Sequence, residues 1–270
     1  MIEYLSSQPL YKWVNSSLLI GSLLLCYLLW IFGFVRQQLT GLGLPRISRF
    51  SGSSFPGIAD ELFVLIFMGF FATSALTNQF SAPAEHTPDN IWMSTFIHII
   101  IFCPFALRYI TLPMPQHRPL RYLLYVFAGL ICIYAFNFVI NASGFCNYLI
   151  ELTGSPKLQE VSTELSQNKN SPALAGLCFS SIIAAPILEE FAFRGFLFNV
   201  LRQRCGIIAA TLASSLLFSA VHVSLIQTLP LFVFACVQCA LYEKTRSLTY
   251  CILLHMIFNT ISTIAILLLS

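Results

Sequence analysis

The feature that most constrains the fold is a series of apolar runs, each about as long as a helix that crosses a membrane. A hydrocarbon core of ~30 Å needs about 20 apolar residues in a helix. On that criterion the 270-residue chain contains eight runs, near residues 15–35, 61–80, 91–112, 122–143, 173–201, 206–223, 226–242 and 247–269. Because unpaired backbone groups find no water inside a bilayer, these runs predict an all-α, polytopic membrane helix bundle of about eight transmembrane helices.

The composition agrees with an integral, multi-pass membrane protein. Hydrophobic residues make up 57% of the chain and charged residues only 9%, whereas soluble domains carry roughly 25% charged residues. The net charge of +3 is scattered and forms no basic stripe, which argues against a nucleic-acid partner. No polar stretch is long enough to bury the core of a second, soluble domain.

The loops between the runs indicate the orientation of the chain. Loops rich in Lys and Arg follow the first, third, fifth and seventh runs and alternate with loops that are not basic. Since basic loops stay in the cytoplasm, this alternation places both termini on the non-cytoplasmic side. The fourth loop, residues 144–172, is the most polar part of the chain and is long enough to hold a short helix.

The fifth run contains an unusual group of charges, within the segment EEFAFRG. Glu189, Glu190 and Arg194 are the only charged residues between positions 173 and 200, and such charges are costly inside a membrane. Glu190 and Arg194 are four residues apart and can pair on one helix face, while Glu189 points about 100° away. Pro186 removes an N–H one turn earlier, which predicts a kink with room for water beside Glu189. An ion pair that only locks two helices together would leave Glu189 unexplained.

Two further motifs follow at compatible depth. FSAVH ends the sixth run with Phe218 and His222, and HMIFN places His255 and Asn259 on one face of the eighth run. Taken singly, such residues can serve packing, since an Asn in a membrane helix often supports helix association. At ~1.5 Å per residue from the basic loops, Glu189, His255 and Asn259 lie roughly 12–20 Å deep, and His222 somewhat deeper. One shared cavity is compatible with these depths.

A buried glutamate beside a histidine is a general-base arrangement for activating water. His255 and Asn259 can supply the N–H donors that a tetrahedral oxyanion needs, so the set fits amide hydrolysis without a covalent intermediate. The rival is a zinc site with Glu189, His222 and His255 as three ligands. There is no HExxH motif, and we favour activation without a metal or other cofactor. Ser219 adjoins His222 in sequence but does not face it on a helix, which argues against a serine nucleophile.

The motifs EExxxR, FxxxH and HxxxN, in this order over roughly residues 172–265, resemble the CAAX protease and bacteriocin-processing family. This family, also called Abi, includes the type II CAAX prenyl endopeptidases. The context EEFAFRGFLF at 189–198 and ALYEKTRSLTYCILLH at 240–255 supports the resemblance. It divides the chain into N-terminal transmembrane helices and loops at 1–171 and a catalytic transmembrane core at 172–270. Relatives often carry glycines where this chain has Ala235, Cys236, Gln238 and Cys239.

The resemblance implies an intramembrane glutamate protease with a peptide or protein substrate at the lipid bilayer. It implies that Glu189 and His222 activate water, that His255 and Asn259 form the oxyanion site, and that Glu190 and Arg194 order the catalytic helix. The alternative is a non-enzymatic membrane scaffold or immunity-type protein that retains the fold, since a fold does not determine function. A transporter is disfavoured because the spans show no internal repeat.

Overall fold

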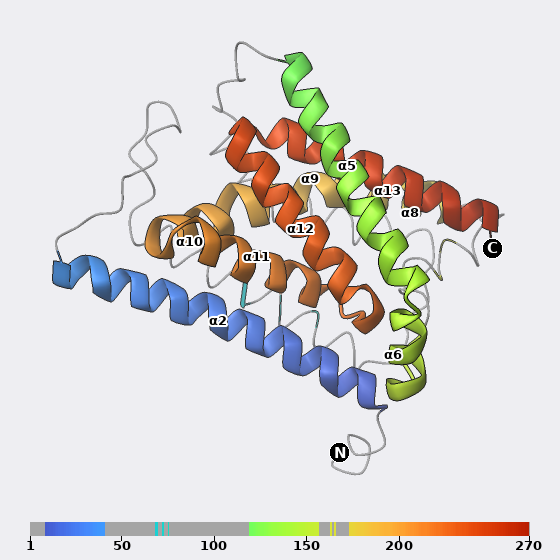
Figure 1. Ribbon diagram of the computed structural model, residues 1–270, viewed down its shortest axis with the longest axis horizontal. Coiled ribbons are helices and arrows are strands. Elements are labelled where there is room, and N and C mark those ends of the chain that lie inside the picture. Colours follow the sequence, from blue (N-terminus) through green and yellow to red (C-terminus); the bar gives the residue numbers. More distant parts are fainter. Residues whose placement is uncertain are drawn as a thin grey trace.

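The computed structural model describes residues 9–40, 68, 69, 72, 75, 119–156, 163, 165 and 173–269. Every regular element in these residues is helical, as the apolar runs predict (Figure 1). Two of the eight predicted spans, at 61–80 and 91–112, lie outside the described residues except at four isolated positions.

The helices fall into an N-terminal and a C-terminal set. The N-terminal set consists of α2 (Leu10–Thr40), α5 (Pro119–Ala142) and the short α6 (Phe145–Thr153). The C-terminal set begins with a continuous helical segment made of α8 (Ala173–Phe179), the π-helical η1 (Ser180–Ala184), α9 (Ala185–Glu190), the π-helical η2 (Phe191–Leu197) and α10 (Phe198–Cys205). It continues with α11 (Ile207–Val221), α12 (Leu225–Thr245) and α13 (Leu248–Leu269). The short helix within the polar loop 144–172 is α6, which lies between Gly144 and Gly154 in the left-handed conformation.

Five of the described helices are long and apolar enough to cross a membrane. They are Leu10–Leu39, Pro119–Ala142, Ala173–Cys205, Leu225–Thr245 and Leu248–Leu268. The predicted span at 206–223 forms α11, which has only 15 residues and therefore rises about 22 Å. That is less than the ~30 Å hydrocarbon core, so α11 by itself is too short to cross it. The described part of the chain thus contains five full-length candidate spans and one shorter apolar helix of 10–17 residues, α11, and a count of eight is not established.

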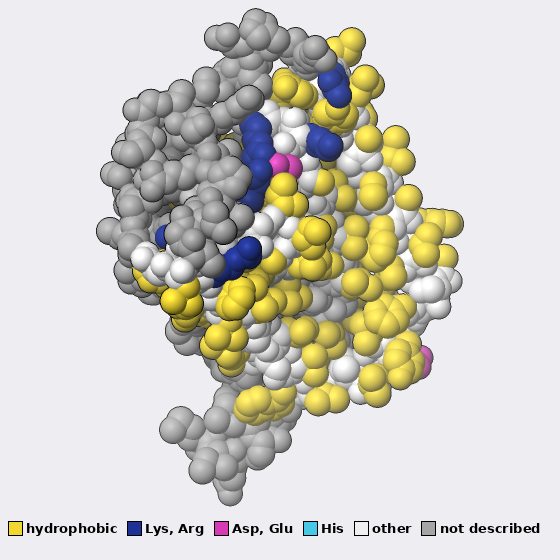
Figure 2. All heavy atoms as spheres, turned by 60° about the vertical axis from the view of Figure 1, so that its left-hand side comes forward, with side chains coloured by type: hydrophobic (Ala, Val, Ile, Leu, Met, Phe, Trp, Pro, Cys, Tyr) yellow, Lys and Arg dark blue, Asp and Glu magenta, His cyan; other side chains and the backbone are white. Residues whose placement is uncertain are grey.

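Short connections make α10, α11, α12 and α13 neighbours in space (Figure 1). Gly206 alone separates α10 from α11, and its positive φ of 84° is one that glycine adopts without steric cost. The core lies where α11, α12 and α13 meet, and Leu217, Phe218, Phe234 and Leu254 are completely buried there. In the view of Figure 2, hydrophobic side chains cover most of the described surface, and Lys and Arg side chains gather along one border. Such a surface suits contact with lipid, with the charges at the membrane boundary.

Helix α2 lies along the C-terminal set from one end to the other. Cys26 contacts the carbonyl oxygen of Ala213 in α11 at 3.6 Å, and the Gln37 amide donates to the carbonyl of Gln203 in α10 at 3.1 Å. The two helices come closest at Gly33, where a β-carbon would lie 2.6 Å from the carbonyl carbon of Arg204. The absence of a side chain at Gly33 therefore permits the contact between α2 and α10.

We predict that Gly33→Ala lowers the thermal unfolding midpoint of the purified protein. The new methyl group meets backbone atoms of α10 that cannot move aside alone, and such overpacking typically costs about 1–3 kcal/mol. Gly21→Ala is the matched control, because a β-carbon there has nothing within 4 Å in the described structure. Equal midpoints for the two variants would contradict the close approach.

Candidate active site

The two glutamates of EEFAFRG lie in α9, a short α-helical segment between two π-helical segments. The irregularity expected at Pro186 takes this form. The N–H of Ala185 bonds to the carbonyl of Ser180, five residues back. In the same register the next donor would be residue 186, and its acceptor would be the carbonyl of Ser181. Proline has no N–H, so this carbonyl loses its partner within the helix. π-Helical turns are frequent at functional sites because they disturb the regular spacing of side chains.

The Asn259 side chain satisfies the carbonyl that Pro186 leaves unpaired. Its amide nitrogen Nδ2 donates to the carbonyl oxygen of Ser181 at 2.7 Å. Asn259 is on α13, so this bond ties α13 to the interrupted helix. The second π-helical segment has a similar device, in which Asn199 Nδ2 donates to the carbonyl of Arg194 at 2.9 Å. Where the hydrogen bonds change from π-helical to α-helical spacing, one carbonyl is left without an N–H partner inside the helix. At both segments the side-chain amide of an asparagine binds this carbonyl.

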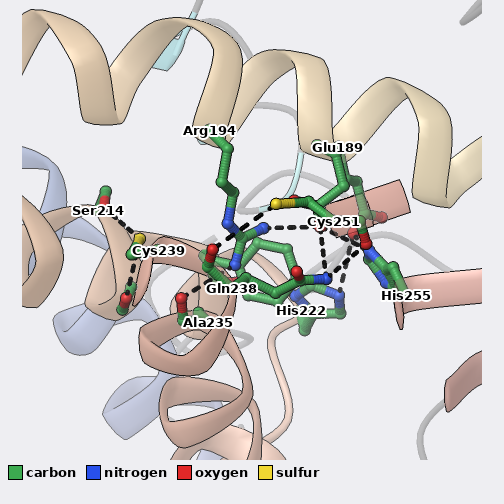
Figure 3. Close-up of polar contacts among 12 residues, drawn as sticks. Glu189, Arg194, Ser214, His222, Ala235, Gln238, Cys239, Cys251 and His255 are labelled. Atoms are coloured by element: carbon green, nitrogen blue, oxygen red, sulfur yellow. Dashed lines mark hydrogen bonds and ion pairs between the residues drawn. The ribbon is translucent and has the colours of Figure 1, made fainter. Parts of the chain in front are cut away.

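The Glu190 carboxylate is fully buried and is the centre of a polar cluster. Its Oε1 atom accepts from Arg194 at 2.9 Å, from His255 Nδ1 at 2.8 Å and from Gln238 Nε2 at 3.2 Å. The predicted pairing of Glu190 with Arg194 is therefore confirmed. Arg194, itself 1% exposed, also donates to the carbonyl of Ala235 at 3.3 Å. The cluster links α9 and η2 to α12 and α13 (Figure 3).

Gln238 is a member of this cluster that the sequence interpretation missed. Its side chain is completely buried, and Nε2 donates to Glu190 and also to the carbonyl of Cys251 at 3.0 Å. One amide group thus connects α12 with both α9 and α13. The available signal was a polar amide within an apolar span, which is costly in a membrane unless it is bonded. In the sequence, Gln238 stands out otherwise only as a departure from the glycine that relatives often carry.

Phe218, the aromatic residue of FxxxH, lies under the polar groups and separates them from the rest of the core. The Arg194 guanidinium carbon is 4.6 Å from its ring centroid, a distance suited to a cation–π contact. The His222 ring lies 4.9 Å away and the His255 ring 6.1 Å away, measured between centroids. One phenylalanine therefore contacts residues of all three motifs.

Glu189, His222 and His255 converge on one point. The Oε2 atom of Glu189 is 3.9 Å from Nε2 of His222 and 3.9 Å from Nε2 of His255. That oxygen is buried and has no hydrogen-bond partner among the described residues. Figure 3 shows Glu189 approaching the two rings from α9, with His222 and His255 on separate helices. Polar atoms at such a distance are too far apart for direct hydrogen bonds and suit a bridging water.

The partners of the two Nδ1 atoms determine which ring nitrogens carry protons. His222 Nδ1 is 2.7 Å from the carbonyl of Phe218, and His255 Nδ1 is 2.8 Å from Glu190. Both partners can only accept, so each Nδ1 must donate. In the neutral rings both Nε2 atoms are then acceptors. Three acceptor atoms, two nitrogens and one carboxylate oxygen, therefore face each other, and a molecule with two protons to donate fits between them.

The structure brings five of the six predicted site residues into one continuous set. These are Glu189, Glu190, Arg194, His222 and His255. The sixth, Asn259, is one helical turn from His255 and uses one N–H on Ser181, which leaves its second N–H for another acceptor. Ser219 is completely buried and bonds the carbonyl of Leu216 in its own helix.

The zinc alternative was weighed on the same residues. In the part of the chain that the structure describes, no three His, Cys, Asp or Glu side chains are grouped in a way that could hold a metal ion. Hydrogen bonds at both Nδ1 atoms orient the two rings with their Nε2 atoms toward Glu189.

The fold and the site define a class, a polytopic membrane helix bundle with a buried glutamate–histidine centre. Residues 171–261 match the family model of Rce1-like type II CAAX prenyl endopeptidases, so this part of the chain is similar to that family. The match confirms the resemblance inferred from EExxxR, FxxxH and HxxxN, and the long apolar helices are those of an integral membrane protein. No curated protein and no solved structure was found to match the chain.

We predict that Arg194→Met strongly lowers the thermal unfolding midpoint. The change removes the cation that neutralises the fully buried Glu190, and loss of one partner of a buried pair costs about 3–5 kcal/mol. Arg202→Met is the matched control, since Arg202 pairs with a partly exposed Glu243, and exposed pairs contribute about 0–1 kcal/mol. Similar losses in the two variants would show that the Glu190 cluster is not a particular source of stability.

A second prediction concerns Asn259 and the π-helical break. Asn259→Leu should cost about 1–3 kcal/mol of stability, because the Ser181 carbonyl loses its partner. In a Pro186→Ala background the cost should shrink, since residue 186 then offers its own N–H. Thr260→Val is the control, because among the described residues the Thr260 hydroxyl bonds only a carbonyl of its own helix, that of Met256. An equal cost of Asn259→Leu in both backgrounds would refute the link to proline.

Proposed function

We propose that the protein is an intramembrane endopeptidase that hydrolyses a peptide bond near the membrane through a water activated by Glu189. The observation that carries the proposal is the convergence of Glu189 Oε2 with His222 Nε2 and His255 Nε2, each 3.9 Å away. These atoms lie in the segment that matches a family of endopeptidases. A general base and a donor for the developing oxyanion are the two elements that uncatalysed amide hydrolysis lacks.

In the first step two of these atoms, Glu189 Oε2 and His222 Nε2, hold the attacking water. The water donates its two protons to Glu189 and His222, so that a lone pair of its oxygen is directed at the substrate carbonyl carbon. As the new carbon–oxygen bond forms, one proton passes to the Glu189 carboxylate, and the carbonyl oxygen acquires a negative charge. A base positioned in this way typically contributes about 10²–10⁴-fold to the rate.

His255 and Asn259 are proposed to bind the oxyanion, and the structure sets a condition on His255. Its Nδ1 is committed to Glu190, so Nε2 can donate only when the ring is protonated. Glu190 is proposed to do more than order the helix, because its bond to Nδ1 holds the His255 ring in the orientation that an oxyanion requires. The free N–H of Asn259 supplies the second donor.

The tetrahedral intermediate then breaks its carbon–nitrogen bond. The proton held by Glu189 passes to the leaving amine, and the other product is a carboxylic acid. No bond to the protein forms at any stage. The site is surrounded by apolar helices, so the substrate is proposed to be a peptide or protein segment that reaches it from the membrane.

The test is Glu189→Gln, which keeps the shape of the side chain and removes the base. Peptide termini are compared by mass spectrometry in cells that produce the wild-type chain, Glu189→Gln or the control Glu151→Gln, whose exposed carboxylate lies on α6. New termini should appear with the wild type and the control. With Glu189→Gln their rate of formation should fall by about 10²–10⁴-fold at equal protein abundance.

The same experiment separates the protease from the scaffold. A Glu189→Gln chain that yields the wild-type set of termini at the wild-type rate refutes the mechanism. A cellular phenotype that this variant rescues as well as the wild type favours a non-enzymatic scaffold with the same fold.

A further inference from the structure

The turn that follows His222 has an unusual backbone conformation. Val223 has a positive φ of 52°, in the left-handed region that β-branched residues rarely adopt. It directly follows the C-terminal cap of α11, a position that glycine commonly fills because glycine has no β-carbon to clash. The N–H of Val223 bonds the carbonyl of Ala220 at 3.1 Å, and the chain then turns into α12 through the extended Ser224. A valine in this conformation must be held there by its surroundings.

The side chain that holds this turn comes from the N-terminal helix α2. Asn15, on α2, donates from Nδ2 to the carbonyl oxygen of Val223 at 2.8 Å across 208 residues of sequence. Asn15 is only 3% exposed, and a polar amide inside an apolar membrane helix is costly unless it is bonded. The rest of α2 contacts α10 through Gly33 and α11 through Cys26. The Asn15 bond extends this contact to the end of α11 that carries His222.

The position of His222 depends on this turn. His222 is the cap residue of α11, immediately before Val223. Its Nδ1 is bonded to Phe218 in its own helix, while its Nε2 faces Glu189 in a different helix. If Val223 relaxed to a negative φ, the end of α11 would rearrange and the ring would turn away from Glu189. The backbone beside His222 is therefore held from outside the 171–261 segment that matches the endopeptidase family.

We propose that Asn15 is a positioning residue, which holds the strained turn at Val223 and thereby orients the His222 ring toward Glu189. Its catalytic consequence rests on the proposed function, whereas its structural consequence does not. The N-terminal helix α2 is then part of the functional unit, although it lies outside the residues 171–261 that match the family model.

The experiment uses the full-length purified chain and two readouts. Asn15→Leu removes the amide and keeps a side chain of similar size. The first readout is the rate at which diethyl pyrocarbonate modifies His222, measured by mass spectrometry, which needs no proteolysis. We expect this rate to rise severalfold as the ring leaves Glu189. The second readout is formation of the new peptide termini, which should slow by about 10- to 100-fold, the effect of a catalytic group displaced by about 1 Å.

Rescue distinguishes positioning from a general loss of stability. A glycine at position 223 adopts the left-handed conformation without the hydrogen bond from Asn15. The double variant Asn15→Leu, Val223→Gly should therefore regain the wild-type modification rate of His222. Ser22→Ala is the matched control on α2, because the buried Ser22 hydroxyl bonds only Leu19 of its own helix among the described residues. It should change neither readout.

The outcomes are separate for the two proposals. Unchanged reactivity of His222 in Asn15→Leu, an equal change in Ser22→Ala, or no rescue by Val223→Gly overturns the positioning role. A changed and rescued reactivity in a chain that forms no new termini supports the positioning role and counts against the protease. If Asn15→Leu does not accumulate in cells, recovery of its abundance by Val223→Gly supports the proposal, and no recovery overturns it.

Discussion

A carboxylate with no access to solvent has to be neutralised and hydrogen-bonded within the protein, because its charge is too costly to leave alone in an apolar interior. Glu190 meets this requirement by drawing donors from three directions, namely Arg194 on its own helix, Gln238 on α12 and His255 on α13. Each donor is limited to a small range of positions by the distance of a hydrogen bond. The buried charge therefore determines how α9, α12 and α13 are placed relative to one another, and His255, which we propose as an oxyanion donor, is one of its hydrogen-bond partners.

The interrupted helix from Ala173 to Cys205 depends on a second constraint, the pairing of every backbone carbonyl in an apolar environment. A proline and two π-helical segments break the regular ladder near the glutamates. The carbonyls of Ser181 and Arg194 are then bonded by Asn259 and Asn199. The break provides the irregular geometry that a site requires, and the two amides make it compatible with a membrane. A similar balance holds at the turn after His222, where a strained valine is bonded to an asparagine of another helix.

Several parts of this arrangement could be predicted from the sequence because they depend only on spacing along a helix. Four residues bring Glu190 and Arg194 to one face, and this pair is present at 2.9 Å. Rough depth in the membrane was compatible with one cavity for Glu189, His222 and His255, and Glu189 Oε2 lies 3.9 Å from Nε2 of each histidine. The apolar runs predicted an all-α membrane bundle, of which five long candidate spans are described. The short α11 was less predictable, since its ends are set by Gly206 and the turn at Val223 rather than by apolar length.

The sequence by itself determined the class of structure and the internal ion pair, and it indicated the candidate site residues, because apolar length and helical period act within single segments. Only the tertiary structure decided which atoms those residues use. Gln238 and Asn15 stand out in the sequence only as polar amides in apolar runs, and nothing local identifies their partners, which lie 48 and 208 residues away. The tertiary structure also made Glu190 a ligand of His255 and so assigned the ring protons, which no pattern of residues could do. A hydrogen bond depends on distances of a few tenths of an ångström, and those distances exist only after the helices have packed.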